Sequence, residues 1–149
     1  MFTPKNILVP TDFSKYSDAA LKIAVDMAVT YDANIYLIHA IDNIISRKSI
    51  DYGISYEEIK QIEENSINAS GEKLAKQAAA IIKNGNIKVV QVTKIGDPAE
   101  VILKEQKARK VDLIVIASHG KSGIVRYLMG SVATKVAKSA KCPVMLVKI

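Results

Sequence analysis

The sequence predicts an α/β fold in which five parallel strands form an open, doubly wound sheet with helices on both faces. Five short apolar segments begin near Ile7, Ile35, Ile87, Leu113 and Val144, and amphipathic helical patterns separate them. The fourth segment, from Leu113 to Ile116, shows no alternation of apolar and polar residues, which is typical of a strand buried on both faces. Right-handed crossovers between such strands give an open sheet.

The composition narrows the class of protein. The chain has 149 residues, the size of one domain spanning 1–149, and 49% of them are hydrophobic, which is enough for a core. No apolar run approaches the roughly 20 residues that cross a membrane, and the first strand follows Met1 too soon for a signal peptide. The single cysteine, Cys142, excludes an internal disulfide and fits a reducing compartment. We therefore expect a cytoplasmic protein with no membrane partner.

Charge is distributed unevenly along the chain. The net charge is +6; residues 100–149 carry 10 Lys/Arg and 3 Asp/Glu (+7), whereas residues 1–99 carry 11 and 12 (−1). The basic third is consistent with solvated helix faces, with a phosphate-binding region or with a nucleic-acid surface. Aromatic residues make up only 5% of the chain, with no Trp and no basic run interleaved with aromatics, which argues against nucleic acid.

The first half of the chain predicts two strands and two helices. A short strand is expected from Ile7 to Pro10, and Ser14 is expected to cap the helix that follows. The buried face of that helix is predicted to be Ala20, Ile23, Ala24, Met27 and Tyr31. A second strand covers residues 34–42, and residues 43–55 form a polar loop. A long helix over residues 56–83 carries a stripe at i+3/i+4 spacing: Ile59, Ile62, Ser66, Ser70, Leu74, Ala78 and Ile81.

The second half adds three strands and two helices. Alternation over residues 87–95 predicts a strand with one wetter face at a sheet edge. Asp97 is a natural N-cap with Pro98 at the first helical position, so this segment predicts a sharp turn and a helix to about Lys110, with no chemistry of its own. Cys142 precedes the last strand and lacks an adjacent base or helix N-terminus, so we expect a structural thiol.

The stretch after the fourth strand carries the main sign of a ligand site. Ala117-Ser118-His119-Gly120 places small residues around one histidine, and small residues at the carboxyl end of a parallel strand leave the backbone open to a ligand. Gly130 and Ser131 then precede a helical pattern, and such a helix start leaves unpaired N–H groups that bind anions. Together these features predict a phosphate pocket.

A second set of candidate residues follows the first strand. Pro10, Thr11 and Asp12 lie at its carboxyl end. Asp12 can either contact a ligand there or simply cap the following helix. The local sequence does not decide between the two roles, and one does not exclude the other.

These residues also resemble a known motif. Ala117, Gly120 and Gly130-Ser131 follow the spacing Gly-x-x-Gly, nine residues, then Gly-Ser or Gly-Thr, with alanine in place of the first glycine. This is the nucleotide-binding pattern of the ATP-binding branch of the universal stress protein family. Four further segments are similar: the first strand and its turn, the end of the second strand, the Gly-x-Pro turn, and Cys-Pro-Val before the last strand. The similarity therefore covers nearly the whole chain.

The resemblance implies a Rossmann-like fold of the adenine nucleotide alpha hydrolase-like type, with strand order 3-2-1-4-5. The order reverses between strands 1 and 4, so a ligand is expected outside their carboxyl ends. The family also implies a stress-response or signalling switch that binds ATP with Mg²⁺ or Mn²⁺, with at most slow hydrolysis. A homodimer is expected through the last strand, from Val144 to Ile149, because its apolar edge would otherwise be exposed.

The resemblance places Asp12 and the backbone of Ala40 at the adenosine, and Ala117 and Gly120 at the ribose and phosphates. N–H groups from Gly130 onward would bind the phosphates. Lys121 and Arg126, in a segment (121–129) expected to close as a lid, are candidate charge partners. The full set of expected nucleotide-binding residues is Pro10, Thr11, Asp12, Ala40, Ala117, His119, Gly120, Lys121, Arg126, Gly130, Ser131, Val132 and Ala133. No catalytic residue and no metal-ligating side chain is expected.

Other functions have partial support. A nucleotide-free dimeric interaction module of the same fold stays open because of Ala117. Gly120-Lys121-Ser122 matches the end of a P-loop, but Val115 stands where the first glycine would be. Ser118 beside His119 lacks the Gly-x-Ser-x-Gly elbow of a hydrolase, and adjacent residues at a strand end are expected to point in different directions. Two histidines without local acidic partners do not indicate zinc.

Overall fold

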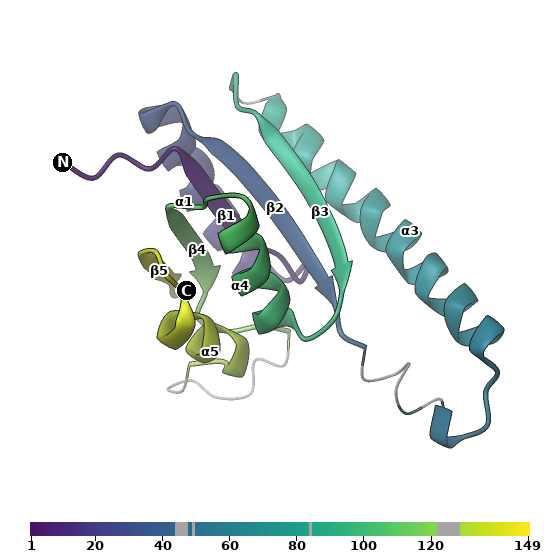
Figure 1. Cartoon of the computed structure of the whole chain (residues 1–149). Helices are drawn as coiled ribbons and strands as arrows, with labels where there is room; N and C mark the ends of the chain where they lie inside the picture. The colour runs from purple at the N-terminus through teal and green to yellow at the C-terminus, as the bar shows by residue number, and fades with distance from the viewer. Residues whose placement is uncertain (44–47, 49, 84, 122–128) are drawn as a thin grey trace.

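The computed structural model describes residues 1–43, 48, 50–83, 85–121 and 129–149. The elements are β1 (Asn6–Pro10), α1 (Lys15–Tyr31), β2 (Asn34–Ile41), α3 (Tyr56–Ile82), β3 (Val89–Ile95), α4 (Pro98–Ala108), β4 (Leu113–Ala117), α5 (Ser131–Ser139) and β5 (Val144–Val147). The five strands form one parallel sheet in the order β3-β2-β1-β4-β5, as predicted (Figure 1).

Helices cover both faces of the sheet (Figure 1). On one face, α1 and α3 pack on the odd-numbered side chains of β1 and β2, represented by Ile7, Val9, Ile35 and Leu37. On the other face, α4 and α5 pack on a second cluster around Leu8, Ile38, Ile114 and Ile116. Because side chains alternate along a strand, each central strand contributes to both clusters. All five residues of β4 are buried, which explains why its sequence does not alternate.

The predicted helix starts are confirmed. The Ser14 hydroxyl accepts a hydrogen bond from the Ser17 N–H and caps α1. Asp97 caps α4 in the same way through the Glu100 N–H, with Pro98 as the first helical residue. Ser55 and Glu58 form a reciprocal capping box at the start of α3.

Three local predictions differ from the structure. The buried face of α1 consists of Ser17, Ala20, Leu21, Ala24 and Ala28. Ile23, predicted to face the core, is 38% exposed, because small residues let α1 lie close to the sheet on a neighbouring face. β3 begins at Val89 rather than Ile87, and Ile87 is buried outside the ladder. The stripe along α3 is buried only at Ile59, Leu74, Ala78 and Ile81.

The structure contains no helix, among the residues it describes, that is both long enough and apolar enough to cross a membrane.

Candidate functional site

A pocket of about 390 Å³ opens where β1 and β4 end, on the face covered by α4 and α5. The strand order reverses between these two strands, which is where open α/β sheets bind ligands. Seven of the predicted site residues line it: Pro10, Thr11, Asp12, Ala40, Ala117, Lys121 and Val132. The structure thus brings together segments that lie up to about 120 positions apart in the sequence.

The apolar wall of this pocket includes residues that the sequence did not reveal. Ser17, Ile38, Pro98, Ile102 and Ile116 complete its lining. The predicted helix start at Asp97-Pro98 is confirmed, and Pro98 and Ile102 in addition line the pocket. The i, i+4 spacing of Pro98 and Ile102, at a helix start that follows a strand, could have indicated that both side chains lie on the helix face nearest the carboxyl edge of the sheet.

Asp12 joins the two halves of the site. Its Oδ1 accepts a hydrogen bond from the Ser14 N–H (3.0 Å) and its Oδ2 accepts one from the Lys121 N–H (2.8 Å). Burial raises the pKa of Asp12, but the hydrogen bonds from Ser14 and its neighbours outweigh burial and lower the pKa below its usual value of 3.8. Since Ser14 is the N-cap of α1, Asp12 does not cap that helix; it holds the loop after β4 as a carboxylate.

The backbone after Asp12 is strained. Phe13 has a φ of 63°, a left-handed conformation that costs a side-chain-bearing residue about 1–2 kcal/mol. The Thr11 hydroxyl accepts a hydrogen bond from the Phe13 N–H (3.1 Å), and it lies 3.2 Å from the Ser17 hydroxyl. These contacts hold the turn, and strain that is maintained this way is common at binding sites.

His39 lies on the opposite face of the sheet from the pocket. Its Nδ1 is 2.8 Å from the Thr11 carbonyl oxygen, and its ring centroid is 4.5 Å from that of Phe13. Burial lowers the pKa of His39 below 6.5; the positive charges of Lys121 and Lys73 act in the same direction, while the Thr11 carbonyl and Asp12 oppose them. His39 therefore supports the turn as a neutral imidazole.

We expect His39 to make stability depend on pH. The folded state resists protonation, so the unfolded chain binds more protons once the pH falls below about 6.5, and stability is lost from there downward. The free energy of unfolding of the wild type should fall more between pH 7 and pH 5 than that of His39→Gln. Urea titrations at the two pH values measure this, and equal losses in both proteins would contradict it.

The two halves of the glycine motif are joined by a backbone hydrogen bond. The Gly130 N–H donates to the Ser118 carbonyl (2.8 Å). This corrects one expectation: the Gly130 amide is already bonded within the chain. The next amides, those of Ser131, Val132 and Ala133, lie in the first turn of α5, where Gly130 supplies no capping side chain. The pocket lining does not include five other predicted residues: His119, Gly120, Gly130, Ser131 and Ala133. Arg126 and most of the expected lid lie outside the described residues.

The arrangement of Ser118 and His119 differs from expectation. The Ser118 hydroxyl lies 2.9 Å from the His119 Nδ1, so the prediction that these neighbours point in different directions is wrong. Ser118 is nevertheless only 2% exposed, and a nucleophile must reach its substrate. The pair therefore does not form an accessible hydrolytic site. No cluster of three or more metal-ligating side chains occurs within the described ranges.

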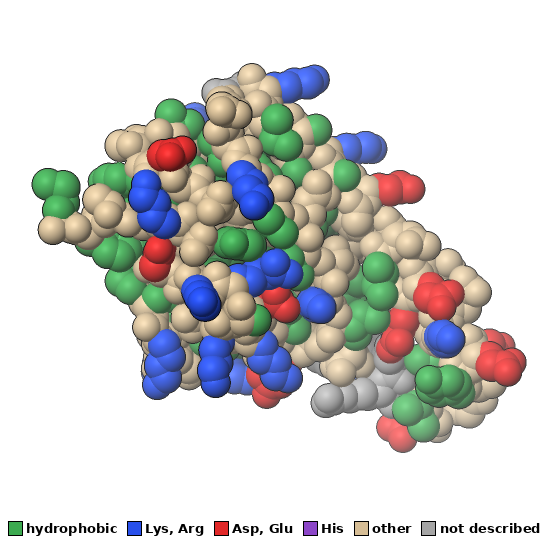
Figure 2. Space-filling view, turned by 45° about the horizontal axis from the view of Figure 1, so that its top comes forward, with side chains coloured by type: hydrophobic (Ala, Val, Ile, Leu, Met, Phe, Trp, Pro, Cys, Tyr) green, Lys and Arg blue, Asp and Glu red, His purple; other side chains and the backbone are tan. Residues whose placement is uncertain are grey.

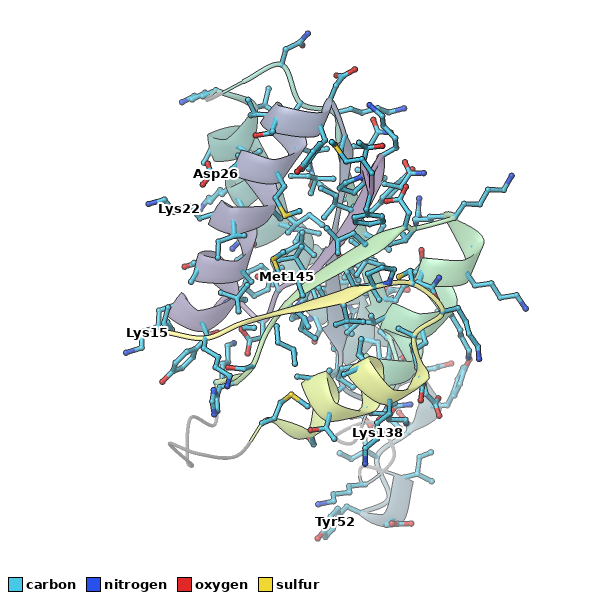
Figure 3. All side chains as sticks on the ribbon, turned by 90° about the vertical axis from the view of Figure 1, so that its left-hand side faces the viewer. Lys15, Lys22, Asp26, Tyr52, Lys138 and Met145 are labelled. Carbon is cyan, nitrogen blue, oxygen red and sulfur yellow. The ribbon has the colours of Figure 1, made fainter. Side chains whose placement is uncertain are left out.

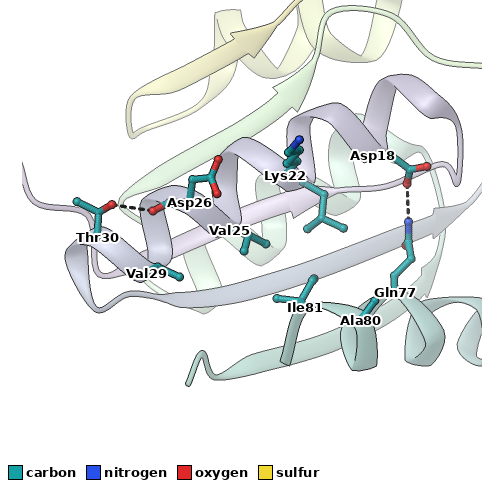
Figure 4. A pocket seen from close by; sticks show the side chains of 10 residues that line it. Asp18, Lys22, Val25, Asp26, Val29, Thr30, Gln77, Ala80 and Ile81 are labelled. Atoms are coloured by element: carbon teal, nitrogen blue, oxygen red, sulfur yellow. Dashed lines mark hydrogen bonds between the residues drawn. The ribbon is translucent and has the colours of Figure 1, made fainter. Parts of the chain in front are cut away.

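A larger groove of about 690 Å³ lies between α1 and α3 (Figure 4). Leu21, Val25, Val29 and Ile81 contribute aliphatic surface, and the Gln77 amide donates to Asp18 at one end (2.9 Å). It runs along α1 from Asp18 to Thr30 and contains none of the predicted site residues. We therefore assign the functional site to the smaller pocket, where strained backbone and convergent polar groups coincide.

Comparison with known proteins identifies the family. A sequence model of the Universal stress protein family matches residues 3–148. Universal stress protein MJ0531 of Methanocaldococcus jannaschii is 33% identical over 144 residues, which cover 97% of this chain and 82% of the relative. The solved structure of MJ0577 from the same organism has a TM-score of 0.86 at 30% identity, covering 99% of this chain and 98% of that one.

A third solved structure shares the same fold at lower sequence identity. A universal stress protein from Archaeoglobus fulgidus, solved in complex with dAMP, has a TM-score of 0.68 at 21% identity and covers 99% of this chain and 100% of that one. The family match spans almost the whole sequence, and the identity to the two Methanocaldococcus proteins reaches 30% or more. This chain belongs to the universal stress protein family.

Proposed function

We propose that the pocket at the ends of β1 and β4 binds an adenine nucleotide, ATP with Mg²⁺ or Mn²⁺, and that the protein acts as a stress-response or signalling switch in the cytoplasm. The observation that carries this proposal is the bond from the Lys121 N–H to Asp12 Oδ2 at a pocket of about 390 Å³, because it joins the first-strand turn to the glycine motif. Pockets of this size hold small ligands. The complex of the Archaeoglobus relative with dAMP supports adenine as the base.

The chemistry of the pocket suggests how a nucleotide would lie in it. Ile38, Ile102, Ile116 and Val132 offer an apolar slot for the base, beside the backbone of Ala40. In this proposal the Asp12 carboxylate would accept hydrogen bonds from the ribose hydroxyls. The first-turn amides of α5, with the Ser131 hydroxyl and Lys121, would meet the phosphates. The divalent ion would be held mainly by the phosphates, and it would supply charge neutralisation.

Nucleotide released from freshly purified protein and identified by mass tests the proposal, together with calorimetry using Mg-ATP, AMP and cyclic AMP. We expect saturable binding of one adenine nucleotide per chain. If the extract contains no nucleotide and no titrated nucleotide binds, the proposal fails, and the nucleotide-free interaction module becomes the better account of the chain.

Ala117 is the feature that favours that alternative, since it replaces the first motif glycine. Ala117 ends β4 and has no positive φ, so alanine fits its backbone without strain. We therefore predict that Ala117→Gly changes the Mg-ATP affinity less than about tenfold, or about 1.4 kcal/mol. Calorimetry on both proteins measures it. A much larger gain would mean that the methyl group obstructs the natural site.

We further propose that the switch is a homodimer formed through β5. This strand ends the sheet, and Figure 3 shows it in front of the molecule with Met145, which is 37% exposed. The Ile114 N–H donates to the Pro143 carbonyl and the Ser118 N–H to the Val147 carbonyl. Because a parallel ladder alternates, the amides of Val144 and Leu146 face outward, where a second copy can pair with them.

Leu146→Pro should therefore weaken the dimer at least about tenfold while sparing the β4–β5 ladder, because it removes only an outward N–H. Proline at Met145 would instead damage the fold, since that amide faces β4. Leu146→Ala, which keeps the amide, is the matched control. Sedimentation velocity over a concentration series measures the effect, and a wild type that sediments as a monomer at micromolar concentration would contradict the proposal.

A further inference from the structure

Helix α3 is longer than the part of the sheet that it covers. Its 27 residues span about 40 Å at 1.5 Å each, whereas the 7 residues of β3 span about 23 Å. Leu74, Ala78 and Ile81 are buried near its C-terminal end, and only Ile59 is buried before them. The first half of α3 consequently projects beyond the carboxyl end of β3 (Figure 1).

This projecting region carries a larger share of the exposed apolar side chains than its share of the sequence. We define the arm as residues 50–67, the turn before α3 together with its first half. Of the 14 large hydrophobic side chains that are exposed among the described residues, 6 belong to the arm. They are Ile50 (66%), Tyr52 (82%), Ile54 (36%), Tyr56 (80%), Ile62 (44%) and Ile67 (37%). A concentration of this kind marks an interaction surface.

The arm also forms one side of a groove. A hollow of about 500 Å³ lies between it and the end of β3, and its apolar lining is Ile50, Ile54, Tyr56, Ile59 and Ile95. Asn43, Lys60 and Glu63 complete it. The groove runs beside a helix, which is the usual setting for docking a second amphipathic helix.

Charge restricts what can occupy this groove. The arm contains five acidic residues (Asp51, Glu57, Glu58, Glu63 and Glu64) and one basic residue (Lys60), a net charge of −4 in a chain of net charge +6. Acidic and hydrophobic side chains lie together at this end of the molecule, at the lower right of Figure 2. A membrane surface or a nucleic acid is anionic and would be repelled, because both attract lysine and arginine instead.

We propose that the arm docks a cationic amphipathic helix of a partner protein. The apolar face of that helix lies in the groove over Ile50, Ile54 and Ile59, and its lysines or arginines face the carboxylates of the arm, of which Glu63 lines the groove. Apolar burial supplies affinity, and the opposite charges set orientation and exclude acidic competitors. This surface is separate from the nucleotide pocket, and the proposal does not depend on nucleotide binding.

The test uses two labelled 14-residue peptides with the same amphipathic helical pattern, one built from Leu and Lys and the other from Leu and Glu. Fluorescence anisotropy with the full chain at physiological salt should show the Leu/Lys peptide binding at least about tenfold tighter, or about 1.4 kcal/mol. The net charge of +6 predicts the reverse order, so this preference would indicate binding at a local acidic surface, which the variants below locate.

Two double variants test whether the peptide binds at the arm. Ile50→Ser combined with Tyr56→Ser should weaken the Leu/Lys peptide at least about tenfold, since both side chains are exposed and their loss does not disturb the core. The matched control, Val29→Ser with Ile82→Ser, removes two other exposed apolar side chains (58% and 52% exposed) outside the arm and should change affinity less than about twofold. Circular dichroism confirms that each variant is folded.

Three results would each overturn the proposal. The Leu/Glu peptide could bind as tightly as the Leu/Lys peptide, which would indicate binding without regard to charge. The arm variant could bind the Leu/Lys peptide as the wild type does. Sedimentation without peptide could show self-association that the arm variant loses, which would assign the surface to a second copy of this chain.

Discussion

Gly130→Val is expected to reduce Mg-ATP affinity by at least about 100-fold, equivalent to about 2.7 kcal/mol. A Cβ at Gly130 would lie 3.3 Å from the Ser118 carbonyl oxygen and 3.7 Å from the His119 Cα, so even one carbon is tight. The branched valine must displace this backbone and disrupt the bond between Gly130 and Ser118. The start of α5 then shifts relative to β4, and the first-turn amides no longer meet the phosphates. Isothermal titration calorimetry measures the loss.

Gly71→Val is the matched control for that experiment. Gly71 lies in α3, and an added Cβ would meet no atom within 4 Å. This variant should keep the wild-type affinity. If Gly130→Val also binds Mg-ATP normally while remaining folded, the phosphates do not lie at α5, and the assignment of the pocket must change.

Leu74→Ala should lower the free energy of unfolding by about 2–5 kcal/mol, the usual cost of removing a buried leucine side chain. Leu74 is 1% exposed and fixes α3 to the core cluster shared with β1 and β2. Ile62→Ala, on the same helix but 44% exposed, should cost less than about 1 kcal/mol, because little area is lost and alanine favours the helix. Chemical denaturation at one fixed protein concentration compares them. Similar losses of unfolding free energy in the two variants would mean that Ile62, in the first half of α3, is buried in a contact.

The sequence was sufficient for the fold because local and long-range signals agree. Alternation identified β3 as an edge strand, the uninterrupted apolar run identified β4 as a central strand, and Asp97-Pro98 marked the start of α4. The strand order itself came from the family resemblance, since periodicity does not specify which strands are neighbours. β5 is too short and too weakly patterned for its edge position to be derived otherwise.

One feature of the fold and one of the site could not be predicted, for different physical reasons. The face that α1 buries was misjudged because Ala20 and Ala24 belong to both candidate faces, and the sequence does not show that a small-residue face would pack closest. The Gly130 amide was expected to be available to phosphate. Its partner, Ser118, lies 12 positions away across the motif, and no local pattern indicates that pairing.

The two bonds that close the motif have a consequence for its length. The Lys121 N–H bond to Asp12 and the Gly130 N–H bond to Ser118 fix the chain on either side of the positions that separate them. Both anchoring bonds involve residues outside that span or at its ends, so inserting residues within it leaves the anchors in place. Doubling the length of a tethered loop costs only about 0.6 kcal/mol of closure entropy. We therefore expect a short insertion between Lys121 and Gly130 to leave both bonds, and with them the two ends of the motif, in place.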